Sequence, residues 1–540
     1  MKKVSFGKVF AMVFPFLLSA IVIAVVWYLL LPAITLRNSG FILTLFLSLV
    51  ILAINVSIMN IITECFDDYG WLRFGLWILA GVVLVVFLIM LFSSWMWFHT
   101  DKAIEVADVT VSDNSVSEVF PDLAVVGTKD LPLVDLDTAI MLGDKKVAGL
   151  KDAPWYEVDK QYSLVKYQGK YYRLAFLDYG GFLKYNKAKH DGIPGYILVE
   201  TTPDGESISQ DARLVKLQQP IRYSESAFWS YDLKRHLRSQ YSNYIFANPS
   251  ICEIDEDGVP YYVTGVMRPT AGAFGVKIMN SFILTNACTG ESIEYSVNEA
   301  PEWVDNVYTL EYLMRVAEWR YAYRNGYWNF SNTNVWHTSY HYRDQRKSSD
   351  DEKFANFYGY AATVADGQVH YYTGLTAANA AESNLGWLLM NMRTGEMTEF
   401  AVVGAEESSA QAAVEQLVSA YRYQATFPLP ANIGGEESYI MCLKGSAGIV
   451  QAYAICNVEN YSLAVQAETL PEAINLYLAK LGYTADRTPI ETDSVEPVVA
   501  YEVPFTDGEV VNTYTVEVNG TEQHYYEIAD GSLYVVVKIK

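Results

Sequence analysis

The chain has 540 residues and a formal net charge of −23. The first 100 residues are slightly basic, at +2, so residues 101–540 together carry a net charge of −25. A surface this acidic repels nucleic acids, whose binding depends on Lys and Arg contacts with phosphates, so a nucleic-acid partner is excluded.

Three long apolar stretches without acidic or basic side chains dominate the first 100 residues. They cover roughly residues 9–34, 41–62 and 74–98. Each exceeds the roughly 20 apolar residues that a helix needs to cross the hydrocarbon core, and backbone groups in lipid must be paired within a helix. We therefore expect a three-helix transmembrane domain over residues 1–100. The first stretch is too long for an ordinary signal peptide.

Basic residues beside the spans predict the orientation of the chain. With a cytoplasmic N-terminus, four basic residues lie on the cytoplasmic side and two on the other side. This bias predicts an integral membrane protein whose large C-terminal region is extracytoplasmic. The four are Lys2, Lys3, Lys8 and Arg73, and the two are Arg37 and Lys102.

Two asparagines lie inside the second span. Asn55 and Asn60 either hydrogen-bond to neighbouring helices or bind another molecule. Side-chain hydrogen bonds within the bundle are the more common use of such residues in membrane helices.

The region beyond the membrane is too large for one core, so we expect several modules. Residues 101–130 are acidic and lack periodicity, which indicates a linker. The modules that we expect are a first α+β module at 131–250, a second hairpin–helix module with an aromatic segment at 251–350, third and fourth hairpin–helix modules at 351–485, and a C-terminal β module at 486–540.

A nine-residue pattern, Thr-Gly-Glu-x-x-Glu-aromatic-x-Val, starts at Thr289 and again at Thr394. In both copies it follows a strand-like run, and its glycine supplies the positive φ of a tight turn. Helical patterns follow at 302–323 and 408–423, and a capping box at Thr469 predicts a third helix. The fold class is therefore a three-helix membrane anchor plus an α+β region of tandem antiparallel hairpin–helix units.

The last residues predict three more strands. These are 513–518 and 523–528, joined by an Asn-Gly turn, and 533–539.

Four cysteines lie in the soluble region. They either form the hairpin disulfides Cys252–Cys288 and Cys442–Cys456 or remain buried free thiols.

Several motifs resemble those of a family of uncharacterised membrane proteins of Gram-positive bacteria and their phages, in which membrane spans precede a large extracytoplasmic domain. The resemblance covers residues 120–350 and implies a cell-envelope location but no known activity. The Thr-Gly-Glu units are also similar to PepSY-type modules, which are proposed to restrain envelope enzymes. The motifs that carry the first likeness are LDTAIMLGDKK at 136–146, GIPGY at 192–196, LKRHLR at 233–238, IDEDGVPY at 254–261 and PEWVD at 301–305.

Catalytic motifs are missing from the sequence: it has no phosphate-binding loop, serine nucleophile elbow, His-Glu-x-x-His or Cys-x-x-Cys. No cofactor is expected. On a helix, His337, His341 and Asp344 have zinc-compatible spacing. The neighbouring Asn and Ser residues favour an aromatic, polar surface loop instead.

An aromatic segment rich in arginine provides candidate residues for partner binding. Aromatic faces beside Arg bind glycans, peptides or proteins, although the same residues also pack inside domains. The candidates are Trp319, Tyr327, Trp328, Trp336, Tyr340 and Arg343.

Two charged clusters have both a functional and a structural interpretation. Residues 135–146 hold acids and lysines that suit either cation binding or a turn-rich segment docked on the first hairpin. Lys234, Arg235 and Arg238 form a basic patch, for which we expect internal ion pairs in so acidic a region.

The sequence therefore favours a non-enzymatic, membrane-anchored scaffold or binding protein that engages an envelope protein or a cell-wall component. One alternative is an envelope hydrolase, metal-assisted through His337 and His341. Another is an accessory subunit of a larger membrane complex, packed on partner helices through Asn55 and Asn60.

Overall fold

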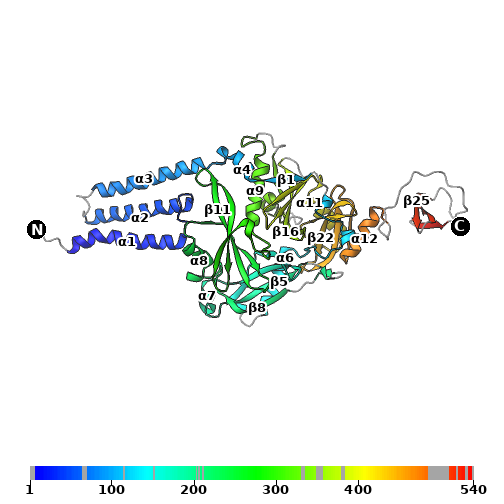
Figure 1. Ribbon diagram of the computed structural model, residues 1–540, viewed down its shortest axis with the longest axis horizontal. Helices are drawn as coiled ribbons and strands as arrows, with labels where there is room; N and C mark the ends of the chain where they lie inside the picture. Colours follow the sequence, from blue (N-terminus) through cyan, green and yellow to red (C-terminus); the bar gives the residue numbers. More distant parts are fainter. Residues whose placement is uncertain are drawn as a thin grey trace.

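The computed structural model has three membrane helices side by side at one end and a β-rich body at the other (Figure 1). The helices are α1 (Phe6–Leu30), α2 (Ser39–Thr63) and α3 (Gly70–Ser93), and each is long and apolar enough to cross a membrane. The three-helix prediction is confirmed. The structure describes residues 6–63, 70–112, 116–149, 153–201, 203–204, 207–208, 212–329, 335–347, 357–378, 383–483, 510–518, 521–528 and 533–537.

Polar side chains connect the membrane helices. The Asn55 side chain donates to the hydroxyl of Ser19 at 3.0 Å, and Trp27 Nε1 donates to Ser48 at 3.0 Å. Asn60 is buried. The asparagines therefore act within the bundle, where interhelical hydrogen bonds stabilise packing in lipid.

The body contains four antiparallel sheets with one shared arrangement. In each sheet, two short strands pair with the same long strand. That strand pairs with a second long strand, which in turn pairs with the last strand. The first sheet has β2 (Tyr156–Val158), β3 (Ser163–Tyr167), β4 (Lys170–Tyr179), β5 (Ile193–Glu200) and β8 (Ala212–Ile221). The second has β9 (Ile245–Phe246), β10 (Ile251–Ile254), β11 (Pro260–Ala271), β12 (Gly275–Asn286) and β13 (Ser292–Ser296).

The third and fourth sheets repeat this order. The third has β14 (Trp336–Thr338), β15 (Ala361–Ala365), β16 (Gln368–Ala377), β17 (Ser383–Asn391) and β18 (Met397–Phe400), and it adds β1 (Val109–Ser112) and β19 (Gly404–Ala405). The fourth has β20 (Gln424–Ala425), β21 (Leu429–Ile433), β22 (Glu436–Lys444), β23 (Val450–Asn457) and β24 (Ala464–Ala467).

A helix precedes each sheet, and the same backbone hydrogen bond ties the two together. A backbone N–H in the segment that leads into each helix donates to the carbonyl just beyond the second long strand of the sheet that follows. The four bonds are Leu133 to Thr201, Tyr223 to Ala287, Tyr308 to Met392 and Ala405 to Val458, at 2.8–3.0 Å. The helices are α6 (Leu136–Ala148), α8 (Leu233–Gln240), α9 (Leu310–Tyr323) and α11 (Glu407–Leu417). Each helix therefore belongs to the sheet that follows it, whereas the expected modules placed α8, α9 and α11 with the hairpin before them.

The predicted turn residues have the expected geometry. Gly290 and Gly395 have φ of +79° and +76°, and in both turns an Asn side chain accepts two backbone N–H groups. Helix α12 (Leu470–Lys480) begins as predicted, because the Thr469 hydroxyl accepts the N–H of Glu472. The predicted C-terminal strands are confirmed as β25 (Val510–Val518), β26 (Thr521–Ile528) and β27 (Leu533–Val537).

The predicted linker at 101–130 is wrong. This segment contains most of α4 (Thr100–Val106), β1 and α5 (Leu123–Val126). Strand β1 pairs in parallel with β18, and small apolar side chains such as Ala103 and Ala107 are fully buried. The 251–350 module also differs from its prediction, since β14 pairs with β16 of the third sheet.

Aromatic contacts join the sheets into one body. Phe176 of the first sheet meets Tyr262 of the second at 5.1 Å between ring centroids, and Trp387 of the third meets Tyr439 of the fourth at 5.6 Å. All four residues lie in one continuous cluster of buried side chains. Edge-to-face and tilted aromatic pairs stabilise such contacts beyond the area that they bury.

The four cysteines of the body are buried free thiols, and the alternative of two hairpin disulfides is wrong. Burial raises the pKa of Cys288 to about 11, so its thiol is a poor nucleophile at neutral pH. Cys65 lies outside the described residues.

The second sheet is fastened to the ends of the membrane helices, next to which it lies in Figure 1. At the tip of the β11–β12 hairpin, the backbone N–H groups of Ala273 and Phe274 donate to Ser94 Oγ at 3.0 and 2.8 Å. On the other side, Ile34 N donates to the carbonyl of Ser242 at 2.8 Å. The body is therefore held at the end of α1 as well as at the end of α3.

Candidate functional site

A cluster of two imidazoles and one carboxylate forms where α9, β14 and α10 (Ser339–Lys347) meet. His337 lies on β14 and His341 in the first turn of α10, and their rings stack at 4.2 Å between centroids. Glu318 of α9 accepts from His337 Nδ1 at 2.8 Å, with His341 Nδ1 at 3.5 Å from the same oxygen. The sequence therefore identified both histidines but missed the carboxylate.

The polar partners of Glu318 fix its position. Its second oxygen accepts the N–H and the hydroxyl of Thr338, at 2.7 and 2.5 Å. Burial lowers the pKa of His341, which favours a neutral imidazole. Two imidazoles and a carboxylate, with ligand atoms within 4.8 Å of one another, are a donor set that zinc accepts.

Asp344 is not part of this cluster, because its carboxylate pairs with Arg343 at 3.5 Å. The surface loop expected here is instead a short strand followed by a helix. Glu318 lies 19 residues before His337 in the sequence, so only the packing of α9 against β14 brings the three side chains together.

The six aromatic and arginine candidates do not form one surface. Trp336 stacks on Tyr321 of α9. Tyr340 packs against Tyr360, and the guanidinium carbon of Arg343 lies 3.8 Å from the centroid of the Tyr340 ring. Trp319, Trp336 and Tyr340 pack against a second cluster of buried side chains, which is separate from the cluster that joins the sheets. Tyr327 and Trp328 lie apart from them, and Trp328 is 58% exposed and touches Trp97 beyond the end of α3.

The acidic cluster of residues 135–146 has a structural role. Asp135 precedes α6 and forms an ion pair with the buried Lys444 at 2.7 Å, while Asp137 accepts a hydrogen bond from Tyr358. The segment is a helix and not the expected run of turns. It connects the first sheet to the fourth.

The basic patch forms α8, but within the described part of the chain its cations have no ion pair closer than 4 Å, contrary to our expectation. Among the described residues, Arg235 donates to the carbonyl of Tyr28 at 2.5 Å, and Arg238 donates to three carbonyls of residues 241–244. Beside them lies a cavity of about 280 Å³ between α8 and the ends of α1 and α2.

Two partly buried carboxyl groups lie near one another at the first sheet: Asp178 on β4 and Asp159 just after β2. Within the described ranges, neither forms an ion pair with a basic side chain. Burial raises the pKa of Asp178 to about 7 and that of Asp159 to about 6, and the proximity of the two raises that of Asp178 further. The hydroxyl of Ser226 donates to Asp178 at 2.7 Å. Because the folded state raises the pKa of both carboxyl groups, the free energy of unfolding depends on pH.

The fold should be more stable at pH 5 than at pH 8. A raised carboxyl pKa means that the folded state binds more protons, so its stabilisation is complete below the unfolded value near 4 and is lost as pH rises through about 7. Across this window we expect a loss on the order of 2–4 kcal/mol.

Thermal unfolding of the full chain in detergent across this pH range measures the effect. Asp178→Asn, which keeps an acceptor for Ser226, should flatten the profile. An unchanged profile in that variant would rule out Asp178 as its source.

Comparisons with protein-family models, with curated proteins and with solved structures each find no match to this chain.

Proposed function

We propose that this protein is a membrane-anchored scaffold or binding protein of the cell envelope, with its body on the extracytoplasmic side. The observation that supports this most is the attachment of the body to the ends of α1 and α3, through Ile34 and Ser94. A cytoplasmic N-terminus, which the basic residues favour, then places the body outside.

We also propose that the four sheets are repeats of one module. Their shared strand order and the recurring hydrogen bond before each helix support this. Tandem modules suit a protein that presents extended surface to a protein or to a cell-wall polymer. The likeness to PepSY-type modules supports a partner that is itself an envelope enzyme.

Site-specific photo-cross-linking in native membranes tests this function. Trp328 is exposed, so a photoreactive residue there should give a discrete adduct with an envelope protein or a wall polymer. The matched control is the same residue at Trp387, which is 1% exposed. Adducts with lipid or with the chain itself alone, from Trp328, would contradict the binding function.

A second candidate, a metal-assisted envelope hydrolase, is favoured by the cluster of Glu318, His337 and His341. In such a site, the three side chains would hold zinc and leave a position for water or substrate.

This candidate predicts stoichiometric zinc in the purified full chain, measured by elemental analysis. The double variant His337→Ala/His341→Ala should lose the metal, because two of three ligands are gone. His190→Ala, at an exposed histidine far from the cluster in sequence, should retain it. Zinc content near zero in the unmodified chain would eliminate the hydrolase candidate.

A further inference from the structure

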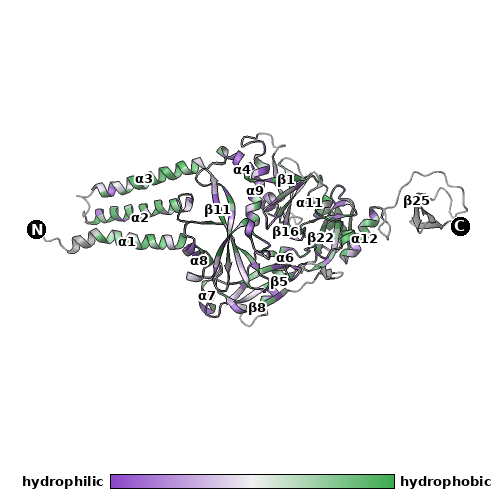
Figure 2. Cartoon of the chain, in the orientation of Figure 1, coloured by the Kyte–Doolittle hydropathy of each residue, from purple (hydrophilic) through white to green (hydrophobic). Residues whose placement is uncertain are grey.

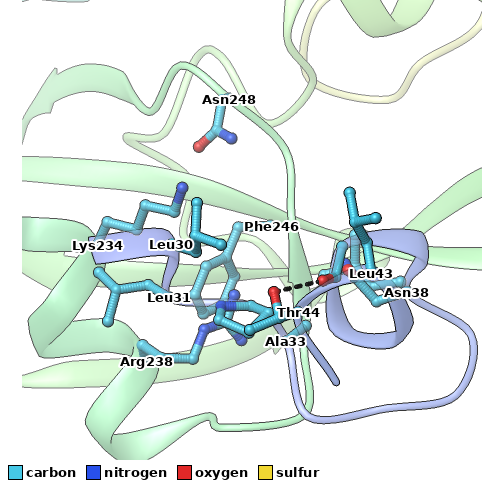
Figure 3. A pocket seen from close by; sticks show the side chains of 13 residues that line it. Leu30, Leu31, Ala33, Asn38, Leu43, Thr44, Lys234, Arg238, Phe246 and Asn248 are labelled. Atoms are coloured by element: carbon cyan, nitrogen blue, oxygen red, sulfur yellow. Dashed lines mark hydrogen bonds between the residues drawn. The ribbon is translucent and has the colours of Figure 1, made fainter. Parts of the chain in front are cut away.

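The cavity at the junction of body and membrane has walls of two kinds. Its membrane side is formed by the end of α1 and the start of α2, and its body side by α8 and the strand β9 (Figure 3). Figure 2 shows hydrophilic α8 next to the end of hydrophobic α1. Because a membrane helix ends where the hydrocarbon core gives way to headgroups, the cavity lies at headgroup level.

Several contacts fix α8 in this place. The guanidinium of Arg235 lies 3.9 Å from the ring centroid of Tyr28 and donates to the carbonyl of the same residue. The ring of Tyr28 also meets Trp229 at 6.2 Å, which is 52% exposed. Phe182 lies beside Trp229 and is exposed too. Exposed aromatic side chains beside a helix end prefer the headgroup layer of a bilayer.

Two cations line the cavity without an acidic neighbour in its wall. Lys234 and Arg238, one helical turn apart on α8, lie on one side of the cavity, and Asn38 and Leu43 lie opposite (Figure 3). None of the described residues that line it is Asp or Glu. Among the described residues, Lys234 has no ion pair within 4 Å. Asp232, at the start of α8, attracts it electrostatically but does not line the cavity.

Arg238 is partly buried, and its guanidinium is only partly satisfied by hydrogen bonds. Its Nη1 donates to the carbonyls of Tyr241, Ser242 and Tyr244, while its buried Nε has no partner among the described residues. Burial lowers its pKa to about 10, which leaves it charged at neutral pH. The body is strongly acidic, but this cavity wall contains two cations and no acidic side chain among the described residues, so it attracts a negatively charged ligand.

Apart from the uncharged polar side chains of Asn38, Thr44 and Asn248, the rest of the lining is apolar. Leu30, Leu31 and Leu43 face the cavity from the membrane helices, and Phe246 faces it from the body. A free phosphate ion gains nothing from leucine side chains, whereas a phospholipid presents a charged phosphate and an apolar glycerol–acyl region together.

We propose that this cavity binds the phosphodiester of an anionic phospholipid from the leaflet on the side of the body. Lys234 and Arg238 pair with the phosphate, and the acyl chains follow α1 and α2. A zwitterionic lipid is disfavoured because its ammonium group would meet two cations in a cavity whose wall has no acidic side chain. The bound lipid fills the gap between α8 and the membrane helices and so sets the tilt of the body on the bilayer.

Competition between two lipids tests the proposal. The full chain is reconstituted into nanodiscs with equal amounts of phosphatidylglycerol and phosphatidylcholine, re-extracted in mild detergent, and analysed by native mass spectrometry. We expect phosphatidylglycerol to be enriched among the retained lipids. Lys234→Gln should lower the enrichment about fivefold, since each basic residue near a membrane surface contributes about 1 kcal/mol toward an anionic lipid.

Two further variants separate charge from fold. Lys145→Gln removes the same charge from an exposed position on α6 and should leave the enrichment unchanged. Leu43→Trp fills the cavity and keeps both cations, and it should also reduce retention. Equal retention of the two lipids by the unmodified chain, or equal effects of Lys234→Gln and Lys145→Gln, would overturn the proposal.

A soluble competitor separates a lipid headgroup from a free anion. Glycerol 3-phosphate added to the chain in phosphatidylcholine nanodiscs should not bind measurably. Binding of glycerol 3-phosphate that is lost in Lys234→Gln, without enrichment of phosphatidylglycerol, would assign the cavity to a soluble anion and overturn the lipid proposal.

Discussion

Replacing Glu407 with Ala should destabilise the body by about 3–5 kcal/mol. The Glu407 side chain is fully buried at the start of α11 and accepts the hydroxyls of Tyr372 at 2.5 Å and Ser339 at 2.9 Å. It therefore connects the helix of the fourth sheet to the third sheet. Its loss leaves two buried hydroxyls without an acceptor and creates a cavity. The measurement is chemical unfolding of the full chain in detergent, followed by tryptophan fluorescence.

Glu407→Gln is the matched control. Burial raises the pKa of Glu407, so a neutral side chain suits the site. Gln accepts one of the two hydroxyls through its oxygen and donates to the other through its NH2 group, and it should cost less than about 1 kcal/mol. Glu468→Ala, at an exposed position just before α12, should have a similarly small effect. A loss in Glu407→Gln as large as in Glu407→Ala would show that the charged form matters, against this account.

Replacing Gly272 with Val should detach the second sheet from α3. Gly272 lies at the tip of the β11–β12 hairpin with φ of +59°, and a Cβ there would lie 2.4 Å from the carbonyl oxygen of Ser93. The clash forces the tip away and breaks the two hydrogen bonds to Ser94 Oγ. We expect a cost of about 2–4 kcal/mol from backbone strain and lost hydrogen bonds.

Disulfide cross-linking across the contact measures this detachment. The rings of Phe87 on α3 and Phe274 on the hairpin lie 6.1 Å apart, so cysteines at both positions should cross-link in membranes, and Gly272→Val should abolish most of the product. Gly326→Val is the control, because Gly326 has φ of +84° but nothing within 4 Å of a Cβ. An unchanged yield in Gly272→Val would show that the tip does not contact α3.

Local patterns predicted the elements whose causes are local. The membrane helices follow from uninterrupted apolar runs, and α12 from the Thr469 capping box with Pro471 in its first turn. The turns at Gly290 and Gly395 follow from their Thr-Gly-Glu sequences. In each case, a few neighbouring residues determine the backbone conformation.

The elements that the sequence did not predict correctly depend on contacts with residues far along the chain. The helical pattern beginning at residue 302 becomes a helix only from Leu310, because the N–H groups of Val307 and Tyr308 pair with Met392 far along the chain. Strand β1 looked like linker, since its partner β18 lies almost 300 residues away.

The candidate sites show the same limit. The spacing of His337 and His341 is visible in the sequence, but Glu318 joins them only through helix packing. Ion pairs were expected for Arg235 and Arg238 from the overall acidity. Their carbonyl and ring contacts depend on how α8 docks on the membrane helices.

The central claim is that three membrane helices hold the body on the side of the membrane opposite the N-terminus. Labelling of intact cells with a membrane-impermeant maleimide tests it most directly. Lys145→Cys places a thiol on an exposed position of α6 and should be labelled without permeabilisation, whereas the native Cys65, between α2 and α3, should react only in permeabilised cells. Protection of the Lys145→Cys thiol until permeabilisation, with Cys65 labelled in intact cells, would contradict the account.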